Sequence, residues 1–488
     1  MTVRSRLRRT RHAMVLWGAA VALAGGVVVA GGASPAAAAG TGPCDIYASN
    51  GTTCVAAHST TRALFGAYSG RLYQVRRGSD GATTDIGTLS AGGFANAAAQ
   101  DSFCAGTSCV ITIIYDQTSR GNDLTQAPAG GAAGGPDNLA NAGALPIMAG
   151  GHKVYGVFVA PGTGYRNDAT SGIATGGASQ GEYMVAAGGH VNSGCCFDYG
   201  NAETNARDNG NGHMGAVYFG TLCWFGFVVP GQCVGSGPWV MADLENGLFA
   251  GANGTNTNNT GRNSTFVTGM VKMNSTTYAI KDADATSGGL KTDYNGPLPT
   301  TSGYTPLRLE GGIILGIGGD NSKGSAGSFF EGVMTAGFPS DAAESAVQAN
   351  ITAVGYAMPG GTGPIVAGDN GAKCVDNDNA AAVPGNKVQM FTCNGFAAAQ
   401  SWTVASNGTI QIDGGCLDIT GANSANGTLI EWWTCNGGAN QQWQAVNGQL
   451  VNPATGKCLD DPNSNTANGT QLVLWACNGG SNQQWHLP

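Results

Sequence analysis

The C-terminal part of the chain is built from three copies of one sequence unit. Cys374, Cys416 and Cys458 follow one another at intervals of 42 residues, and each is followed by a second cysteine 19 residues later. Each unit also ends in a Gln-x-Trp sequence. Such a period is typical of one supersecondary unit that buries its apolar face only against its copies. We therefore expect three all-β units closed around a pseudo-threefold axis, with these tryptophans, Leu417 and Leu459 in a shared core.

The repeat resembles the ricin-B-type β-trefoil lectins, also classed as family 13 carbohydrate-binding modules. In that family an Asp after the first cysteine binds sugar hydroxyls, an aromatic residue two positions before the second cysteine stacks on the sugar, and an Asn-Gln pair before the tryptophan assists. The first repeat has Asp376 and Phe391, but Ala399 replaces the expected Asn. The resemblance therefore implies sugar sites in the second and third repeats, made by Asp418, Trp433, Asn440 and Gln441 and by Asp460, Trp475, Asn482 and Gln483.

Residues 1–40 have the layout of a secretory signal peptide. Five arginines precede an apolar run over residues 13–30, and small residues follow up to Ala37-Ala38-Ala39. We expect cleavage near Ala39 or Gly40 and export of the remaining chain. The alternative is an N-terminal membrane anchor, although the run is rich in Gly and Ala and weakly hydrophobic. No other segment has 18 consecutive apolar residues, so no membrane contact is expected after cleavage.

Export makes disulfide formation possible for the fourteen cysteines of the chain. Their even number and their spacing favour bridges between sequence neighbours, and the spacings match no zinc pattern. Sequence proximity alone does not prove the pairing. The expected pairs are Cys44-Cys54, Cys104-Cys109, Cys195-Cys196, Cys223-Cys233, Cys374-Cys393, Cys416-Cys435 and Cys458-Cys477.

The composition points to a β-rich protein that handles a neutral ligand. Only 11% of the 488 residues are charged and 81 are glycine, which excludes a charged helical bundle and suits strands joined by many turns. The net charge is −8, and no basic patch follows the first twelve residues, so nucleic acid is not an expected partner. Carbohydrates fit better, because aromatic faces and uncharged hydrogen-bonding groups bind them.

The remaining residues, 41–357, predict a large two-sheet β-sandwich. Short β-like runs at 109–115, 153–159, 239–245 and 312–317 are separated by turn residues, and helices are expected only near residues 59–68 and 341–356. Gly and Pro punctuation at 358–366 indicates a linker before the repeat domain at 367–488. The predicted fold class is therefore all-β, with a two-sheet sandwich followed by a β-trefoil.

Two carboxylates of this sandwich are candidates for chemistry. On a strand, Asp243 and Glu245 would point to the same face, and paired carboxylates on one face are common in sugar-cleaving sites. Asp320 follows an apolar strand and two glycines, Gly318 and Gly319, that allow close approach to a ligand. The alternatives are a solvated strand edge for Asp243 and a turn-forming role for Asp320.

The adjacent Cys195 and Cys196 are a third candidate feature. A disulfide between neighbours closes a small, rigid ring. We interpret it as an apolar sulfur platform on which a sugar face packs. The alternative, that each cysteine bridges elsewhere, is weakened because every other cysteine has a close partner in the sequence.

At these residues the domain resembles the catalytic domain of family 54 glycoside hydrolases, the secreted α-L-arabinofuranosidases. The matching stretches include CCFDYGNAET, GPWVMADLENGLFAG and ILGIGGDNSKGSAGSFFEGVMTAGFPSD. The resemblance implies a β-sandwich that hydrolyses with retention of anomeric configuration and needs no metal or organic cofactor. It implies Glu245 as nucleophile and Asp320 as general acid/base, with the arabinose subsite lined by Cys195, Cys196, Trp224, Asp243, Asn246 and Gly319.

The chain departs from the family in two places. Cys223 and Cys233 flank a short insertion beside Trp224, and a ricin-type trefoil stands where the family has an arabinose-binding trefoil. We expect a secreted, monomeric enzyme that releases arabinofuranose from arabinoxylan or arabinan. The alternatives are a galactofuranosidase or an endo-xylanase on the same scaffold, and a lectin without catalytic activity.

Overall fold

The computed structural model describes residues 40–223, 233–251, 254–405, 408–446 and 448–488. The predicted signal peptide, apart from Gly40, and the predicted subsite residue Trp224 lie outside the described residues. Among the described residues, no helix is long and apolar enough to cross a membrane.

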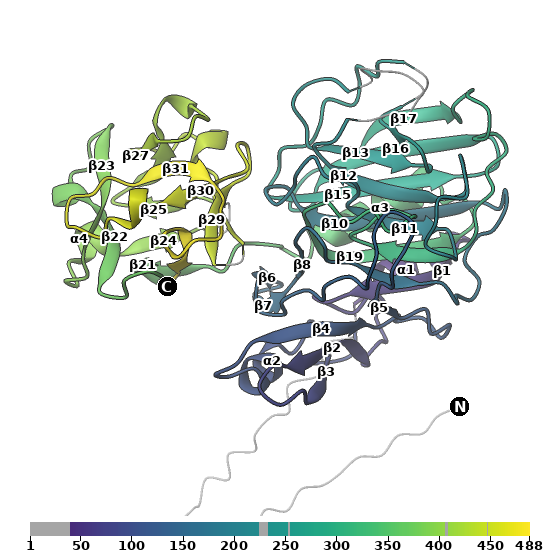
Figure 1. Cartoon of the computed structure of the whole chain (residues 1–488), viewed down its shortest axis with the longest axis horizontal. Coiled ribbons are helices and arrows are strands. Elements are labelled where there is room, and N and C mark those ends of the chain that lie inside the picture. Colours follow the sequence, from purple (N-terminus) through teal and green to yellow (C-terminus); the bar gives the residue numbers. More distant parts are fainter. Residues whose placement is uncertain (1–39, 224–232, 252–253, 406–407, 447) are drawn as a thin grey trace, which may run out of the picture. The chain divides into compact units, whose positions relative to one another are not determined.

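Most strands within residues 53–336 belong to two antiparallel sheets (Figure 1). The first sheet runs in the order β1 (Thr53–Ser59), β19 (Gly327–Ala336), β10 (Gln180–Ala187), β15 (Phe266–Met273), β16 (Thr277–Asp284) and β17 (Lys291–Pro297), with β8 (Val157–Val159) also paired to β19. The second sheet runs in the order β14 (Leu248–Phe249), β13 (Trp239–Asp243), β12 (Gly215–Gly220), β11 (Asp198–Ala202), β18 (Gly312–Leu315), β9 (Tyr165–Asn167), β5 (Leu124–Gln126), β4 (Cys109–Ile114), β2 (Arg71–Arg77) and β3 (Thr83–Gly87).

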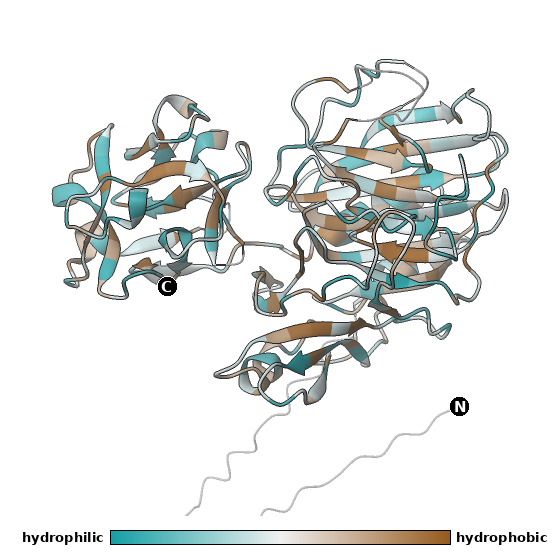
Figure 2. Ribbon diagram, in the orientation of Figure 1, coloured by the Kyte–Doolittle hydropathy of each residue, from teal (hydrophilic) through white to brown (hydrophobic). Residues whose placement is uncertain are grey.

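The sandwich core lies where the two sheets face each other. Strands β12 and β13 pack across β15 and β16, and Figure 2 shows hydrophobic residues concentrated on these strands. At Gly269 in β15, an added Cβ would lie 3.0 Å from Val240 and 3.2 Å from Val217. Glycine at this position therefore allows the valines of the second sheet to approach the first closely. The predicted all-β sandwich is confirmed.

The helices are short and lie outside the sheets. They are α1 (Pro43–Ser49), α2 (Ala97–Phe103), α3 (Asp341–Thr352) and α4 (Ala397–Gln400), and β6 (Pro146–Ala149) and β7 (His152–Tyr155) form a separate hairpin. Helix α3 begins where the sequence predicted it, because Ser340 caps it by accepting a hydrogen bond from the Ala343 amide at 3.1 Å.

The helix predicted at residues 59–68 is wrong. Strand β1 continues to Ser59, and no helix follows it in this segment. The Ser59 hydroxyl accepts hydrogen bonds from the amides of Thr61 and Arg62, and the Leu64 amide donates to the Gln117 side chain at 2.7 Å. Side chains thus satisfy backbone groups that a helix would have paired internally.

A third sheet is formed by residues 361–486 and closes as a β-trefoil, which confirms the prediction for the repeat. Its strands are β20 (Gly361–Gly363), β21 (Val366–Ala367), β22 (Lys373–Asn377), β23 (Asn386–Thr392), β24 (Trp402–Val404), β25 (Ile410–Ile412), β26 (Gly415–Ile419), β27 (Thr428–Thr434), β28 (Gln444–Val446), β29 (Gln449–Asn452), β30 (Lys457–Asp460), β31 (Val473–Ala476) and β32 (Trp485–His486). Because β20 pairs with β24, residues 361–363 of the predicted linker are hydrogen-bonded into this sheet.

The three Gln-x-Trp tryptophans occupy equivalent places in the trefoil core. Trp402, Trp443 and Trp485 are buried. Each indole N–H donates to a backbone carbonyl at the start of its own repeat, those of Val375 at 2.8 Å, Leu417 at 2.9 Å and Leu459 at 3.0 Å. The repeated sequence therefore encodes a repeated buried hydrogen bond as well as apolar packing.

Seven disulfides join the described residues, in the pairs that the sequence spacing predicted. One closes each trefoil repeat, and the other four lie within residues 44–233. Each trefoil disulfide spans 19 residues, so it links the first strand of its repeat to the end of the second.

Candidate active site

The predicted catalytic and subsite residues in the described part of the chain line one pocket. Its volume is about 410 Å³. The predicted residues in its wall are Cys195, Cys196, Asp243, Glu245, Asn246, Gly319 and Asp320, and the others are Ser193, Asp208, Met214, Leu222, Gly318 and Ser322. Asp243 is the last residue of β13, and the other lining residues follow the ends of β12, β13 and β18 or precede β11 and β12. The second sheet therefore positions the whole site.

Glu245 lies just beyond strand β13, which ends at Asp243. The expectation that both carboxylates share one strand face is therefore wrong, because Glu245 and Asn246 have φ of +62° and +53° and turn the chain sharply. The turn is held by the Asp243 carboxylate, which accepts a hydrogen bond from the Glu245 amide at 3.0 Å. The Tyr304 hydroxyl donates to the Glu245 carbonyl at 2.9 Å. Both carboxylates still line the pocket. The turn brings Glu245 there, and not the alternation of side chains along a strand.

Asp320 lies in the loop that follows β18. The loop turns back on itself because the Gly318 amide donates to the Ser322 carbonyl at 2.9 Å. The half-buried Asp320 carboxylate accepts a hydrogen bond from the Ser322 amide at 2.9 Å. The turn-forming role that we considered for Asp320 is therefore present, and the same turn keeps the side chain in the pocket wall.

Gly319 allows the loop to lie directly against two carboxyl groups. A Cβ at this position would overlap Oε2 of Glu203 and would lie 2.8 Å from Oε2 of Glu245. Arg166, which is 2% exposed, donates to the Gly319 carbonyl at 2.7 Å and to the Glu203 carbonyl. Because residue 319 has no side chain, the loop that contains Asp320 can lie directly against the turn that contains Glu245.

The carboxyl groups of the site perturb one another. Burial raises the pKa of Glu245, and the neighbouring carboxyls of Glu203 and Asp243 raise it further. Burial also raises the pKa of Asp243 to about 7 and that of Glu203 to about 7. Asp198, fully buried behind Asp243, has its pKa raised by burial and by the Asp243 charge. At neutral pH the site therefore holds fewer negative charges than carboxyl groups.

The Cys195–Cys196 disulfide forms the apolar side of the pocket. Cys196 is buried in a cluster with Tyr218, Trp239, Met241 and Leu248. Both sulfurs and a carboxylate oxygen of Asp243 lie within 4.8 Å of one another. The sulfurs are bonded to each other and provide no thiolate for a metal. This group therefore gives the pocket an apolar surface beside a hydrogen-bonding carboxyl.

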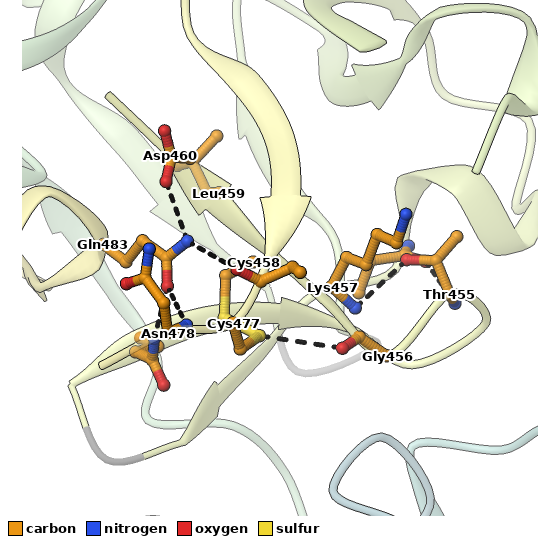
Figure 3. Close-up of a disulfide and its surroundings, with 12 residues drawn as sticks. Thr455, Gly456, Lys457, Cys458, Leu459, Asp460, Cys477, Asn478 and Gln483 are labelled. Carbon is orange, nitrogen blue, oxygen red and sulfur yellow. Dashed lines mark hydrogen bonds between the residues drawn. A yellow bond between two sulfur atoms is a disulfide. The ribbon is translucent and has the colours of Figure 1, made fainter. Parts of the chain in front are cut away.

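In the trefoil, the second and third repeats build the same polar group beside an exposed tryptophan. Asp418 accepts hydrogen bonds from Asn440 at 2.9 Å and from Gln441 at 2.7 Å, and Trp433 is 39% exposed. Asp460 accepts from Asn482 at 2.9 Å and from Gln483 at 2.7 Å, and Trp475 is 42% exposed. Figure 3 shows the Gln483 amide between Asp460 and the Asn478 backbone, beside the Cys458–Cys477 disulfide.

The first repeat is built differently. Asp376 accepts hydrogen bonds from Gln400 at 3.0 Å and from Gln389 of strand β23 at 2.9 Å, and Ala399 is buried without a polar group. Gln389 therefore supplies the second amide that Asn440 and Asn482 supply elsewhere. Phe391, in place of the tryptophan, is only partly exposed.

Comparisons with known proteins cover both parts of the chain. The family model described as "Alpha-L-arabinofuranosidase B, catalytic" matches residues 43–357, and that described as "Ricin-type beta-trefoil lectin domain" matches residues 361–485. The chain is 60% identical over 325 residues to alpha-L-arabinofuranosidase B of Aspergillus oryzae, which is 65% of this chain and 63% of that protein. It is 59% identical over 338 residues to alpha-L-arabinofuranosidase of Hypocrea jecorina, which is 68% of this chain and 66% of that protein.

The chain thus spans somewhat less than two thirds of the length of these relatives. Among solved structures, it resembles that of an arabinofuranosidase complexed with arabinofuranosyl-alpha-1,2-xylobiose, with a TM-score of 0.64 and 38% sequence identity. That likeness covers 91% of this chain and 98% of the other.

Proposed function

Because the chain belongs to the alpha-L-arabinofuranosidase B catalytic family, with a ricin-type lectin domain after it, we propose that it releases terminal arabinofuranose from plant polysaccharides. The observation that carries this proposal is the single pocket in which Glu245 and Asp320, from two separate turns, border the Cys195–Cys196 platform. A solved relative was crystallised with an arabinofuranosyl xylobiose, which supports arabinose side chains on xylan as the substrate class.

The proposed reaction proceeds in two steps with retention. Glu245 attacks the anomeric carbon while Asp320 gives its proton to the departing glycosidic oxygen, so that the C–O bond breaks and an arabinosyl ester of Glu245 forms. Asp320, now ionised, then removes a proton from a water molecule that attacks the same carbon and displaces Glu245. Two inversions at one carbon leave arabinose in its original configuration.

The proposal is tested by the products that the protein releases. We expect free arabinose from arabinoxylan and from arabinan, with the α anomer appearing first when the reaction is followed by proton NMR. Linear xylan is the matched control and should release nothing. Xylo-oligosaccharides without free arabinose would contradict the proposal in favour of an endo-xylanase, and the β anomer as first product would contradict the retaining mechanism.

We also propose that the protein is exported and works outside the cell. Seven disulfides in the described residues support this, because such bridges persist in oxidising compartments. Mass spectrometry of protein from the culture medium should give an N-terminus near Gly40. Retention of the protein with the cells would contradict this proposal.

The trefoil is proposed to hold the enzyme on its polymer through Trp433 and Trp475. We expect the double variant Trp433→Ala/Trp475→Ala to bind insoluble xylan at least about tenfold more weakly, because each aromatic face contributes roughly 1 kcal/mol or more to stacking. The measurement is a pull-down of the full chain, with Leu429→Ala as control because Leu429 is also exposed on β27. Wild-type binding of the double variant would show that the ligand or the sites are different.

A further inference from the structure

The turn that carries Asp320 is shaped by its own hydrogen bonds but is held in place by others. Within the turn, the Gly318 amide donates to the Ser322 carbonyl at 2.9 Å, and the Asn321 amide donates to the Gly318 carbonyl at 3.0 Å. These bonds fix the conformation of residues 318–322 and not their position in the pocket wall. Contacts from outside the turn must therefore place the Asp320 carboxyl.

A glycine- and alanine-rich segment after strand β5, residues 127–137 with the sequence APAGGAAGGPD, packs directly against this turn. The Ala132 amide donates to the Asp320 carbonyl at 3.0 Å. At Gly130, an added Cβ would overlap Cβ of Asn321 and would lie 2.7 Å from the Asp320 carbonyl oxygen. The small residues of the segment therefore allow its backbone to support the turn at close range.

Asp137, the last residue of this segment, bonds the turn through side chains. It is 1% exposed, and its Oδ1 accepts hydrogen bonds from the Asn321 side-chain amide at 3.1 Å and from the Lys323 ammonium group at 2.8 Å. Asn321 is itself fully buried and directly follows Asp320 in the chain. One buried oxygen thus holds the chain at two points close behind the Asp320 carboxyl.

The backbone of Asp137 is fixed in turn at the end of strand β5, which belongs to the second sheet. The Asp137 amide donates to the Ala127 carbonyl at 3.0 Å. The Asp137 carbonyl accepts a hydrogen bond from the side chain of Gln126, the last residue of β5, at 2.5 Å. The position of the Asp320 turn is therefore set from the sheet, through Asp137.

Asn321 is a residue type that suits this junction in two ways. Its φ is +70°, in the left-handed region that asparagine and glycine adopt more readily than other residues. Glycine would satisfy the backbone but has no side chain, whereas the asparagine amide also reaches Asp137. A substitution can therefore separate the side-chain bond from the conformation of the turn.

We propose that Asp137 is a positioning residue for the general acid/base: by bonding Asn321, it fixes the Asp320 carboxyl beside the glycosidic oxygen. A small displacement of a catalytic group has a large effect on the rate, so loss of this anchor should impair proton donation and leave the Glu245 turn in place. Asp137 does not belong to the described residues that line the pocket, so it acts only through the turn. The inference rests on the proposed function, in which Asp320 is the acid/base.

The test compares two substrates that differ in how much they need an acid. Methoxide leaves methyl α-L-arabinofuranoside only with a proton, whereas 4-nitrophenolate leaves with little assistance, and kcat/KM reports formation of the glycosyl-enzyme from either one. In Asp137→Leu, which keeps the volume without an acceptor, kcat/KM should fall about 30-fold or more on the methyl substrate and stay within about threefold of wild type on the nitrophenyl substrate. Asn321→Gly should behave in the same way, because it allows the left-handed turn but has no amide side chain.

Asp137→Asn is the conservative variant. Its side-chain oxygen can still accept the bond from Asn321, so kcat/KM should stay within about threefold of wild type on both substrates. The matched control is Gln100→Leu, because Gln100 is also buried and makes two side-chain hydrogen bonds, to Tyr73 and Ala142, away from the pocket lining. This control should lower the unfolding temperature and leave the ratio of the two kcat/KM values unchanged.

Three results would overturn the proposal. The first is wild-type activity of both Asp137→Leu and Asn321→Gly on the methyl substrate. The second is an equal loss on the two substrates in both variants, since a general structural defect would then explain it. The third is a selective loss on the methyl substrate in Gln100→Leu, since any buried polar group would then have the same effect.

Hydrogen exchange of the unliganded protein tests the anchor without a substrate. In Asp137→Leu and Asn321→Gly, peptides that contain residues 318–322 should exchange faster than in wild type, and peptides that contain Glu245 should be unchanged. Unchanged exchange at 318–322 would overturn the role of Asp137, and Asn321→Gly supplies this result if Asp137→Leu does not fold. Faster exchange there, with a wild type that does not cleave 4-nitrophenyl α-L-arabinofuranoside, would support the anchor and contradict the proposed function.

Discussion

Glu245→Gln is expected to lower kcat on 4-nitrophenyl α-L-arabinofuranoside by about 10⁴-fold or more, because an amide cannot form the glycosyl ester. Glutamine preserves the side-chain volume, so the turn held by Asp243 should persist and the variant should unfold at a temperature close to that of wild type. The measurement is release of 4-nitrophenolate, with Glu310→Gln as the control. Activity near the wild-type level would exclude Glu245 as nucleophile.

Glu245→Ala provides a more specific form of the same test. The shortened side chain leaves room for azide on the face of the sugar that the carboxylate otherwise attacks. Azide should restore turnover and yield an arabinosyl azide whose anomeric configuration is opposite to that of the substrate, because a single displacement replaces two. NMR of the product determines the anomeric configuration of the arabinosyl azide. An azide product with the configuration of the substrate would show that the nucleophile is another residue.

Asp320→Asn is expected to lose activity to an extent that depends on the leaving group. On arabinoxylan, whose sugar oxygen departs only with a proton, kcat should fall by about 10³-fold or more. On the nitrophenyl substrate, formation of the glycosyl-enzyme needs little acid assistance, so a burst of nitrophenolate should precede slow turnover. Stopped-flow measurement of the burst and product analysis on arabinoxylan give the two values to compare.

The matched control for Asp320 is Asp243→Asn, which removes a different carboxyl of the same pocket. Because Asp243 is assigned to binding, its variant should show no such dependence on the leaving group. In Asp320→Ala, azide should accelerate turnover of the nitrophenyl substrate and give an azide of unchanged configuration, the reverse of the result for Glu245→Ala. Equal losses on both substrates for Asp320→Asn would contradict its assignment as acid/base.

Much of the architecture was predictable because its determinants are local or periodic. The 42-residue spacing encodes the trefoil, since each repeat places its tryptophan, Trp402, Trp443 or Trp485, 26 or 27 residues after the residue whose backbone carbonyl it bonds. Cysteines that are close in sequence are close in space, so their pairing followed from spacing. The helix predicted at residues 59–68 does not form, because the side chains of Ser59 and the distant Gln117 accept hydrogen bonds from backbone amides of this segment.

Several residues of the candidate pocket were predictable from the sequence, but their geometry was not. Glu245 and Asp320 were identified from a short acidic motif, a pair of glycines and the family resemblance, yet the strand expected to carry Glu245 ends two residues earlier in a left-handed turn. Glu203 was missed, although it is one of six glutamates in residues 41–357 and lies in the stretch CCFDYGNAET. Its neighbours Glu245 and Gly319 are far away in sequence, and nothing in its own segment indicates them.

The sequence by itself therefore indicated the two folds, the disulfide partners and, through the family resemblance, the pair of carboxylates on which the proposed chemistry depends. The folds and the disulfide partners follow from the repeat period, the spacing of the cysteines and the residue types along the chain. Only the tertiary structure decided which carboxyls meet, because burial and charge proximity depend on the folded chain. By bringing Glu203, Glu245 and the bare backbone of Gly319 against one another, the fold raises the pKa values of the two carboxyls.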